Sequence, residues 1–366
     1  MNVPLLRFPE FEGGWARTEL GSHCQTTTGR LDANAMREDG QYKFFTCAKE
    51  VYQIDEFAFD SEALLVSGNG ANVGYIHYYR GKFNAYQRTY VLDQFDLDIR
   101  FVQRVLERDL RKRIYGEVKE GNTPYIVKST LTEMPLSSPS LPEQEKIAAF
   151  LGVVDARIAA LRDRVAGLER YKRGLMQALF SQSLRFTKPD GIPFPDWKEK
   201  RLGEVAAINK GKQLNRDTLD TAGRYPVVNG GVAPSGYHDA YNTEAGAITI
   251  SEGGNSCGFV GFQRTQFWSG GHCYVLAPNR LLINNDFLFQ VLKFEELSIM
   301  RLRVGSGLPN IQKGDLTKFA LPIPHPDEQA KIAKALSAMD AKIAAVTDQL
   351  ARMQDFKKGL LQQMFV

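Results

Sequence analysis

The residues best suited to chemistry are cations and amides that follow a short apolar stretch. This group contains Lys210, Lys212, Gln213, Asn215 and Arg216. Cations hold phosphates, and amides can pair with base edges in a groove of DNA. The group is therefore suited to reading DNA, although any polar loop has a similar composition. The net charge of +4 is too small to identify a partner by itself.

Two turns at equivalent places in the chain carry further amides. Residues 67–72 read Ser-Gly-Asn-Gly-Ala-Asn, and residues 251–256 read Ser-Glu-Gly-Gly-Asn-Ser. A tight turn alone explains the glycines. Different polar residues on one kind of turn are nevertheless what a shared scaffold with two specificities would show.

Side-chain chemistry divides the candidate DNA contacts into two classes. Cations are predicted to contact the phosphate backbone, and amides to read base edges in the major groove. The predicted phosphate contacts are Lys82, Arg88, Lys210, Lys212 and Arg264. The predicted base readers are Asn69, Asn72, Gln213, Asn229 and Asn255. For any single asparagine, a structural role in a turn explains the residue at least as well.

No catalytic or metal-binding motif stands out in the chain. Phosphate-loop and nucleophile-elbow patterns are missing, as is the Asn/Asp-Pro-Pro-aromatic pattern of DNA methyltransferases. A faint nuclease-like group, Pro189, Asp190, Asp196 and Lys198, falls in a proline-rich linker and is better explained as a loop. The four cysteines have no Cys-x-x-Cys pair, so we expect reduced thiols and no metal site.

These candidates are distributed over an internal repeat. Residues 144–180 recur as residues 329–365 at a constant offset of 185, with 17 of 37 positions identical. Residues 74–92 also align without a gap to residues 258–276. Each half therefore has the same order of a globular segment, a proline-marked junction and a long helix.

The apolar residues of both predicted helices are spaced by threes and fours. This spacing places a narrow apolar seam on one side of a helix, which is typical of a coiled coil. The central seam residues are Leu151, Val154, Ile158, Leu161, Leu336, Met339, Ile343 and Val346. The simplest partner of each helix is the other copy in an antiparallel pair, which would place the globular parts at opposite ends. Packing of each helix on its own domain is the alternative.

The fold class expected from these patterns is α+β, with two similar globular domains joined by two long antiparallel helices. Short strand-like runs occur at residues 63–66, 74–79 and 89–92, and again at 247–250, 257–262 and 273–276. Helices are predicted at residues 98–114 and 286–302, and the arginines of the first are expected to form a solvated face. The predicted domains are residues 1–140 and 197–324, the long helices are 141–182 and 325–366, and the linker is 183–196.

The junctions and helix ends resemble those of one protein family. Residues 305–311 read Gly-Ser-Gly-Leu-Pro-Asn-Ile, and a Leu-Pro-Ile-Pro segment then leads into Asp327-Glu328-Gln329. The first half has similar marks, although Thr123 and Tyr125 replace the more typical neighbours of Pro124. Together with the two helix ends, this arrangement resembles the DNA-specificity subunit of type I restriction-modification systems, over essentially the whole chain.

The resemblance implies a non-catalytic subunit with one target recognition domain for each half-site of a split DNA target. It implies binding to double-stranded DNA, to methyltransferase (modification) subunits, two being expected, and to translocase/nuclease (restriction) subunits. S-adenosylmethionine, ATP and Mg are expected in those partners, and no cofactor in this chain. Leu175, Phe180, Leu360 and Phe365, expected to be exposed at the helix ends, are the candidate docking residues; closing the seam is the alternative.

Two other functional classes remain open from the sequence. One is a regulatory coiled-coil DNA-binding protein that acts without a methyltransferase, and the other is an endonuclease that acts alone. Pull-down of partners would distinguish the first, and magnesium-dependent cleavage the second. We expect a cytoplasmic protein, because no apolar run is long enough to span a membrane and the N-terminus does not read as a signal peptide.

Overall fold

The computed structural model describes residues 3–117, 124–305 and 307–366, and the chain forms two compact units. Unit 1 contains Met1–Arg162 and Asp348–Val366, and unit 2 contains Asp163–Thr347. Each unit therefore takes part of both long helices. Thr123 and Ser306 of the family-like junctions lie outside the described residues, as does the side chain of Arg216.

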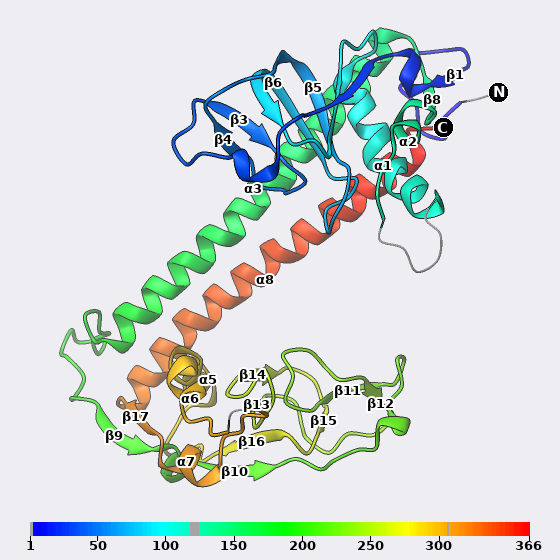
Figure 1. Ribbon diagram of the computed structural model, residues 1–366. Coiled ribbons are helices and arrows are strands. Elements are labelled where there is room, and N and C mark those ends of the chain that lie inside the picture. The colour runs from blue at the N-terminus through cyan, green and yellow to red at the C-terminus, as the bar shows by residue number, and fades with distance from the viewer. Residues whose placement is uncertain (1–2, 118–123, 306) are drawn as a thin grey trace. The chain divides into compact units, whose positions relative to one another are not determined.

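The two long helices are α3 (Leu141–Phe180) and α8 (Pro326–Gln363) (Figure 1). In unit 1, the beginning of α3 shares a core with the end of α8. In unit 2, the end of α3 shares a core with the beginning of α8. The helices therefore pair antiparallel, as predicted. Of the eight predicted seam residues, Met339 and Ile343 are half-buried, and the others are buried.

The first domain is built on a six-stranded sheet with the strand order β2-β7-β5-β6-β3-β4. These strands are β2 (Gln25–Thr28), β3 (Tyr42–Phe45), β4 (Tyr52–Ile54), β5 (Phe59–Ser67), β6 (Ile76–Ala85) and β7 (Thr89–Asp93). A separate pair, β1 (Ala16–Glu19) and β8 (Pro135–Ser138), is antiparallel. The helices are α1 (Ile99–Glu117) and α2 (Lys128–Thr132), and η1 (Leu20–Ser22) and η2 (Ala33–Ala35) are single 3₁₀ turns.

The second domain repeats this plan with a smaller main sheet in the strand order β10-β16-β13-β14. Its strands are β10 (Ala206–Lys210), β13 (Ala247–Ser251), β14 (Val260–Gln263) and β16 (Cys273–Pro278). A small sheet joins β11 (Tyr225–Val228), β12 (Tyr237–His238) and β15 (Trp268–Ser269), and β9 (Lys198–Arg201) pairs with β17 (Ala320–Ile323). The helical elements are α4 (Leu202–Val205), η3 (Arg216–Thr218), α5 (Asn285–Phe294), α6 (Glu296–Met300) and α7 (Lys313–Lys318).

Strand register confirms that the domains are copies. Leu64 of β5 lies opposite Leu92 of β7, and Ile248 of β13 lies opposite Leu276 of β16. The two partners are the same number of residues apart in each pair, and all four side chains are buried. The predicted α+β class and the internal repeat are therefore confirmed, and so are the predicted strands, except that β6 and β14 begin only at Ile76 and Val260. The predicted second helix is divided into α5 and α6, with Glu295 between them.

An aromatic cluster closes each domain against the end of a long helix. In unit 1, the ring of Phe365 lies 5.3 Å from Phe101 and 6.2 Å from Trp15, between centroids. In unit 2, the ring of Phe180 lies 6.2 Å from Phe287 and 6.4 Å from Trp197. Each domain is thus completed by the helix end that belongs to the other half of the sequence repeat.

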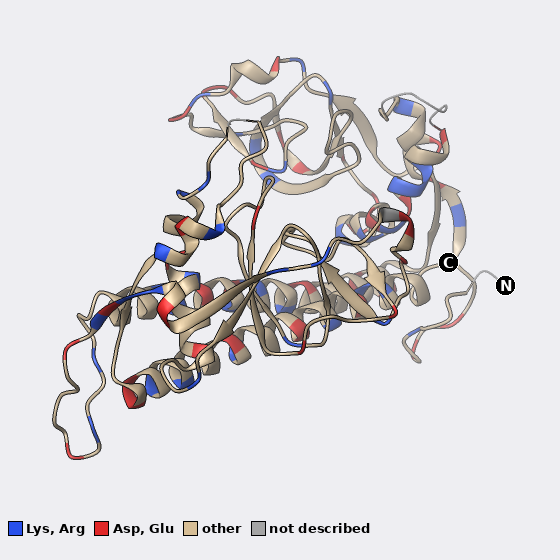
Figure 2. Cartoon of the chain, turned by 90° about the horizontal axis from the view of Figure 1, so that it is seen from below, with Lys and Arg blue, Asp and Glu red and all other residues tan. Residues whose placement is uncertain are grey.

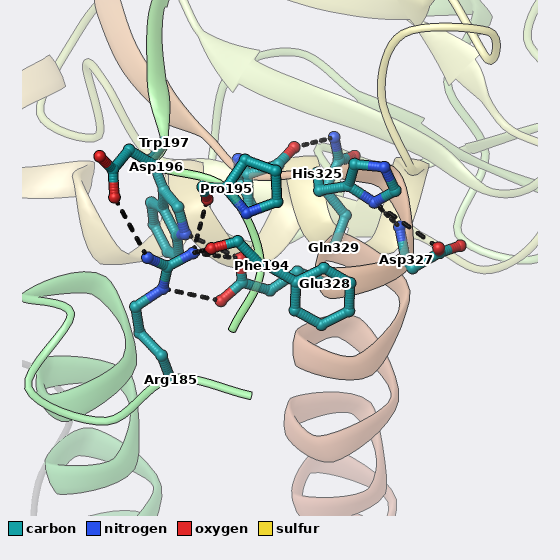
Figure 3. A network of polar contacts seen from close by, with 10 residues as sticks. Arg185, Phe194, Pro195, Asp196, Trp197, His325, Asp327, Glu328 and Gln329 are labelled. Atoms are coloured by element: carbon teal, nitrogen blue, oxygen red, sulfur yellow. Dashed lines mark hydrogen bonds and ion pairs between the residues drawn. The ribbon is translucent and has the colours of Figure 1, made fainter. Parts of the chain in front are cut away.

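A buried carboxylate at the start of α8 ties the helix to the linker in unit 2 (Figure 3). Arg185 binds both oxygens of Glu328, at 3.1 and 2.9 Å, and Trp197 Nε1 donates to Glu328 Oε2 at 3.0 Å. The Glu328 side chain is fully buried, and its hydrogen bonds raise the pKa of Arg185. In unit 1, Arg7 holds Glu143 in the same way, at 2.8 Å to each oxygen.

The neighbouring glutamine of each long helix binds the start of the domain helix. Gln144 Oε1 accepts from Asp98 N at 3.0 Å, and Gln329 Oε1 accepts from Asn284 N at 2.8 Å. Asp98 and Asn284 in turn cap α1 and α5, because their side chains accept from the backbone N–H three residues later. Equivalent hydrogen bonds therefore join the domain to its long helix in both units.

Ion pairs along the long helices follow the repeat as well. Asp340 accepts from Lys172 at 2.6 Å in unit 2, and Asp155 pairs with Lys357 at 2.8 Å in unit 1. Charges of both signs are interspersed along these helices (Figure 2). These side chains are partly buried, so their geometry helps to fix the antiparallel register of the two helices.

Candidate nucleic-acid interface

In the first domain, the loop after β5 is held by three hydrogen bonds. Gly68 N donates to Arg88 O at 2.8 Å, and Ile126 N donates to Gly68 O at 2.8 Å. Tyr90 Oη donates to Ile126 O at 2.9 Å. The loop is therefore fixed between the turn that precedes β7 and the segment that precedes α2.

In the second domain, the loop after β13 is held by the same bonds. Glu252 N donates to His272 O at 2.9 Å, and Ile311 N donates to Glu252 O at 2.8 Å. Tyr274 Oη donates to Ile311 O at 3.0 Å. Glu252 therefore occupies the place of Gly68, and His272 occupies the place of Arg88.

Glycine is required at two places in each of these loops. Gly70 and Gly74 have φ angles of 77° each, and Gly254 and Gly258 have φ angles of 77° and 89°. Side chains with a Cβ rarely adopt this left-handed backbone. The glycines thus shape both turns, as expected, and leave the neighbouring positions to carry different side chains.

A hollow of about 490 Å³ lies beside the loop of the second domain. It is lined by Lys210, Asn229, Glu252, Gly253, Gly254, His272, Leu308, Pro309 and Asn310. Lys210 Nζ lies 2.6 Å from Glu252 Oε1, and the lysine side chain is 53% exposed. The hollow therefore combines a buried acid with an accessible cation and amides.

An adjoining hollow of about 270 Å³ contains Gln213 and shares Asn229 with the first. Gln213 is exposed and donates from Nε2 to Leu214 O at 2.9 Å. Asn229 Oδ1 accepts from His272 N at 3.1 Å, so this oxygen orders the loop. The structure therefore brings together three predicted contacts from two segments: Lys210 and Gln213 from one, and Asn229 from the other.

The other candidates of the second domain have different surroundings. Asn255 is exposed directly after Gly254, which lines the larger hollow. Lys212 is exposed, and its backbone oxygen accepts from Trp268 Nε1 at 2.8 Å. Arg264 follows β14 at the opposite end of β13 from Glu252, so the structure does not bring it to the hollow.

In the first domain, the structure groups Asn69, Asn72 and Arg88. Asn72 Nδ2 donates to Cys47 O at 3.2 Å, and the Cys47 thiol donates to Arg88 O at 3.3 Å. Arg88 is exposed, and Asn69 is half-buried on the same loop. The DNA contacts proposed for these residues stay predictions.

Lys82 lies apart from this group. It is opposite Asp60 near the start of β5, whereas Asn69 and Asn72 follow the end of that strand. Its Nζ lies 4.6 Å from the centroid of the Phe57 ring. A phosphate contact by Lys82 would therefore belong to a separate part of the domain surface.

Sequence reasoning did not single out Glu252, His272 and Tyr274. The signal was available, because an acidic residue interrupts a turn otherwise made of Gly, Ser and Asn. Burial and the neighbouring Glu252 raise the pKa of Tyr274 to about 12. Burial also raises the pKa of Tyr90. Both phenols therefore remain hydrogen-bond donors at neutral pH.

The arginine run of α1 is not simply a solvated face, as the sequence suggested. Arg104 is buried and lies 2.6 Å from Asp155 and 3.0 Å from Glu107. The Arg100 guanidinium carbon lies 3.1 Å from the centroid of the Tyr78 ring. These cations are engaged inside the domain, so α1 does not offer them as a free basic patch.

The expectation that the four docking candidates are exposed is wrong. Phe180, Leu360 and Phe365 are buried, and Leu175 is half-buried against the same core as Phe180. The aromatic clusters of the two domains need these side chains for closure. Leu360 and Phe365 complete the core of unit 1 in the same manner.

Two equivalent aromatic residues of the long helices are exposed instead. Tyr171 of α3 is 63% exposed, and Phe356 of α8 is 52% exposed. They correspond at the offset of 185 and belong to the same repeat position. Neither side chain is therefore part of the buried contact between the two helices.

No catalytic arrangement forms around the predicted linker. Asp190 Oδ1 accepts from Ile192 N at 3.1 Å, and Asp196 is fully exposed at 3.7 Å from Arg185. Within the described ranges, no three His, Cys, Asp or Glu side chains gather as a metal site would require. The nuclease-like group is thus part of the linker structure.

Comparison with known proteins gives a consistent result over the whole chain. The family model for the type I restriction modification DNA specificity domain matches residues 12–170 and 195–353. The specificity subunit of the type I restriction enzyme EcoDI from Escherichia coli is 29% identical over 406 residues, which cover 96% of this chain and 88% of that protein. A putative type I specificity subunit from Mycoplasma pneumoniae is 33% identical over 150 residues, covering 40% of each chain.

A solved structure supports the fold. The crystal structure of the S subunit of a type I restriction-modification system from M. genitalium has a TM-score of 0.73 at 22% identity and covers 100% of this chain and 99% of its own. No helix among the described residues is long and apolar enough to cross a membrane. With two matched copies of the domain and the predicted doubled architecture, the chain belongs to the type I restriction-modification DNA specificity family.

Proposed function

We propose that the chain is the DNA-recognition subunit of a type I restriction-modification complex and reads a split target, one half-site with each domain. The observation that carries this proposal is the pair of equivalent loops. The two loops share their backbone hydrogen bonds, but one presents Gly68 and Arg88 and the other presents Glu252 and His272. A common scaffold with different polar residues suits the reading of two different sequences.

The chain is a non-catalytic specificity subunit, so the reactions belong to its partners. Modification subunits would supply the S-adenosylmethionine site, and restriction subunits would supply ATP-dependent translocation, Mg and cleavage. The comparisons do not support a regulatory protein acting alone or an endonuclease acting alone. The proposed location is the cytoplasm, where the complex meets the DNA.

Two modification subunits fit the doubled architecture. The exposed pair Tyr171 and Phe356 supports this number, because equivalent surfaces suit two copies of one partner. An exposed basic residue lies two positions after each aromatic, Arg173 in one case and Lys358 in the other, whereas Lys172 and Lys357 are engaged in ion pairs. We take these two patches as the docking points in place of Leu175, Phe180, Leu360 and Phe365.

A reconstitution experiment tests the proposal. The purified chain should bind DNA weakly and transfer no methyl group when S-adenosylmethionine is supplied. Addition of the modification subunits should produce sequence-specific binding and methylation, and addition of the restriction subunits should produce cleavage. Methyl transfer by the chain alone, or a complex without sequence preference, would contradict the proposal.

A further inference from the structure

Glu252 is the one buried acid of the hollow in the second domain, within the described part of the chain. Its Oε1 receives hydrogen bonds from Lys210 Nζ at 2.6 Å and from Tyr274 Oη at 3.1 Å. Its Oε2 has no hydrogen-bond partner among the described residues. His272 Nδ1 lies 3.5 Å from Oε2. One carboxylate oxygen is thus fixed by two donors, and the other is a buried acceptor, with less than 1 Å² exposed, that is left unused.

The fold does not need an acid at this position. Gly68 fills the equivalent place in the first domain and makes the same two backbone hydrogen bonds. A Cβ at Gly68 would lie 2.3 Å from Arg88 O, so the first domain excludes any side chain there. The carboxylate of Glu252 is therefore an addition specific to the second domain.

A buried acceptor without a partner has a free-energy cost that binding can recover. Glu252 is only 8% exposed, so water reaches it poorly. A phosphate cannot satisfy it, because both groups are negative. In the major groove, the groups that donate are the N4 amino group of cytosine and the N6 amino group of adenine.

We infer that the loop uncovers Glu252 Oε2 when it meets DNA, and that this oxygen then accepts a hydrogen bond from the exocyclic amino group of one base, cytosine or adenine, in the second half-site. The inference rests on the proposed function of the chain. Lys210 and Tyr274 hold the carboxylate in place through Oε1, so they are positioning residues. Lys210 would then serve base readout, beyond the phosphate contact predicted from its charge.

The test uses the complete complex with modification subunits and targets altered at each base pair in turn. Glu252→Ala and the near-isosteric Glu252→Gln should both relax one base pair of the second half-site, by about 5- to 150-fold in discrimination. The first half-site should not change. Glu244→Gln is the matched control, because Glu244 is an exposed acid of the same domain that binds Gln266 at 2.9 Å.

The relaxed base pair identifies the donor. Loss of preference for C·G over T·A indicates cytosine N4, and loss of preference for A·T over G·C indicates adenine N6. If adenine is read, a purine analogue without the amino group at that position should weaken binding by the wild type and not by the Glu252→Ala variant. Lys210→Ala should relax the same position, and its effect should not add to that of Glu252→Ala.

Several results would overturn the inference. Unchanged discrimination in Glu252→Gln and Glu252→Ala would exclude readout by this carboxylate. Equal weakening for all second half-sites would mean that Glu252 only orders Lys210 for a phosphate. If Glu252→Ala does not fold, Glu252→Gln alone decides between these outcomes. A wild-type complex without any sequence preference would instead contradict the proposed function itself.

Discussion

At the scale of the residue, the two equivalent loops share backbone hydrogen bonds but carry different side chains. Tyr90 and Tyr274 make the same hydrogen bond to the segment before α2 and α7, yet Tyr274 also binds Glu252 at 3.1 Å. A phenol beside a carboxylate favours its protonated form, because ionisation would place two negative charges together. The stability of the second domain should therefore depend on pH in the alkaline range.

Replacement of Tyr274 by Phe should reduce the loss of stability at high pH. The pKa of Tyr274 in the folded state is about 12, above its ordinary value of 10.0. Between these values the unfolded chain releases the proton first, so the stabilisation is complete below pH 10 and is lost as pH rises toward 12. Denaturant unfolding of the wild type and of Tyr274→Phe at pH 9 and pH 11 measures this difference.

Tyr241→Phe is the control for that experiment, since Tyr241 is an exposed tyrosine of the same domain. Its stability should follow the wild type at both pH values. If Tyr274→Phe loses as much stability between pH 9 and pH 11 as the wild type does, the raised pKa has no part in alkaline unfolding.

At the scale of the element, the start of each long helix carries a buried glutamate that connects the helix to its domain. Arg185, Trp197 and Gln329 connect the linker, the second domain and α8 around the buried Glu328 (Figure 3). A buried carboxylate that loses its cation remains uncompensated, which is strongly destabilising. The cation of Arg185 is therefore needed to stabilise the buried Glu328.

The Arg185→Met variant should destabilise the protein by about 3 kcal/mol, because Glu328 would stay buried with Trp197 alone. Arg352→Met is the control: its ion pair with Asp348 is exposed on both sides and should contribute about 0–1 kcal/mol. Thermal and denaturant unfolding measure both values. Equal losses of stability in the two variants would mean that the buried Arg185–Glu328 ion pair contributes no more than the exposed Arg352–Asp348 pair.

The exposed aromatics allow a test of partner number. Tyr171→Ala and Phe356→Ala should each reduce the complex from two modification subunits to one, and the double variant should bind none. Neither side chain is buried, so folding should be preserved. Native mass spectrometry gives the number directly. Two bound subunits in the double variant would place docking elsewhere.

Elements could be predicted from the sequence where periodicity determines them. The threes and fours of α3 and α8, and the repeat of the strands, needed only local spacing and a search for self-similarity. The ion pair of Arg185 with Glu328 could not be predicted in this way, because the two residues are 143 positions apart in the chain. The docking candidates were misplaced for a related reason: the seam pattern does not reveal that Trp15 and Phe101 cover Phe365.

The candidate site was predictable in part. Residue type located Gln213 and Asn229, which converge from separate segments on two adjoining hollows. Composition gave no basis for separating Lys82 and Arg264 from the rest, because their distance depends on strand length and register. Glu252 was not selected, because cations and amides were sought and a buried acid was not.

At the scale of the whole molecule, α3 and α8 are continuous helices that contribute to both units. We expect that these helices set the spacing of the half-sites. One heptad added to each helix, after Arg162 and after Thr347, should then lengthen the helix pair by about 10 Å. The gap in the target should grow by about three base pairs, at roughly 3.4 Å each.

Both half-sites should keep their sequences in that variant, because neither domain is altered. The measurement is the methylated motif of cells that carry the lengthened chain with its partner subunits. An insertion of seven residues in one helix only is the control and should disrupt the paired seam. An unchanged gap in a variant that still supports methylation would show that the helices do not measure distance.

The central claim is that each domain reads its own half of a split target. The most direct measurement is methylome sequencing of cells with the intact gene, without it, and with Glu252→Gln. We expect a methyl-adenine motif with two short half-sites and a fixed gap, absent without the gene and relaxed in one half-site only by the variant. A continuous motif, methylation that persists without the gene, or relaxation of both half-sites together would contradict the account.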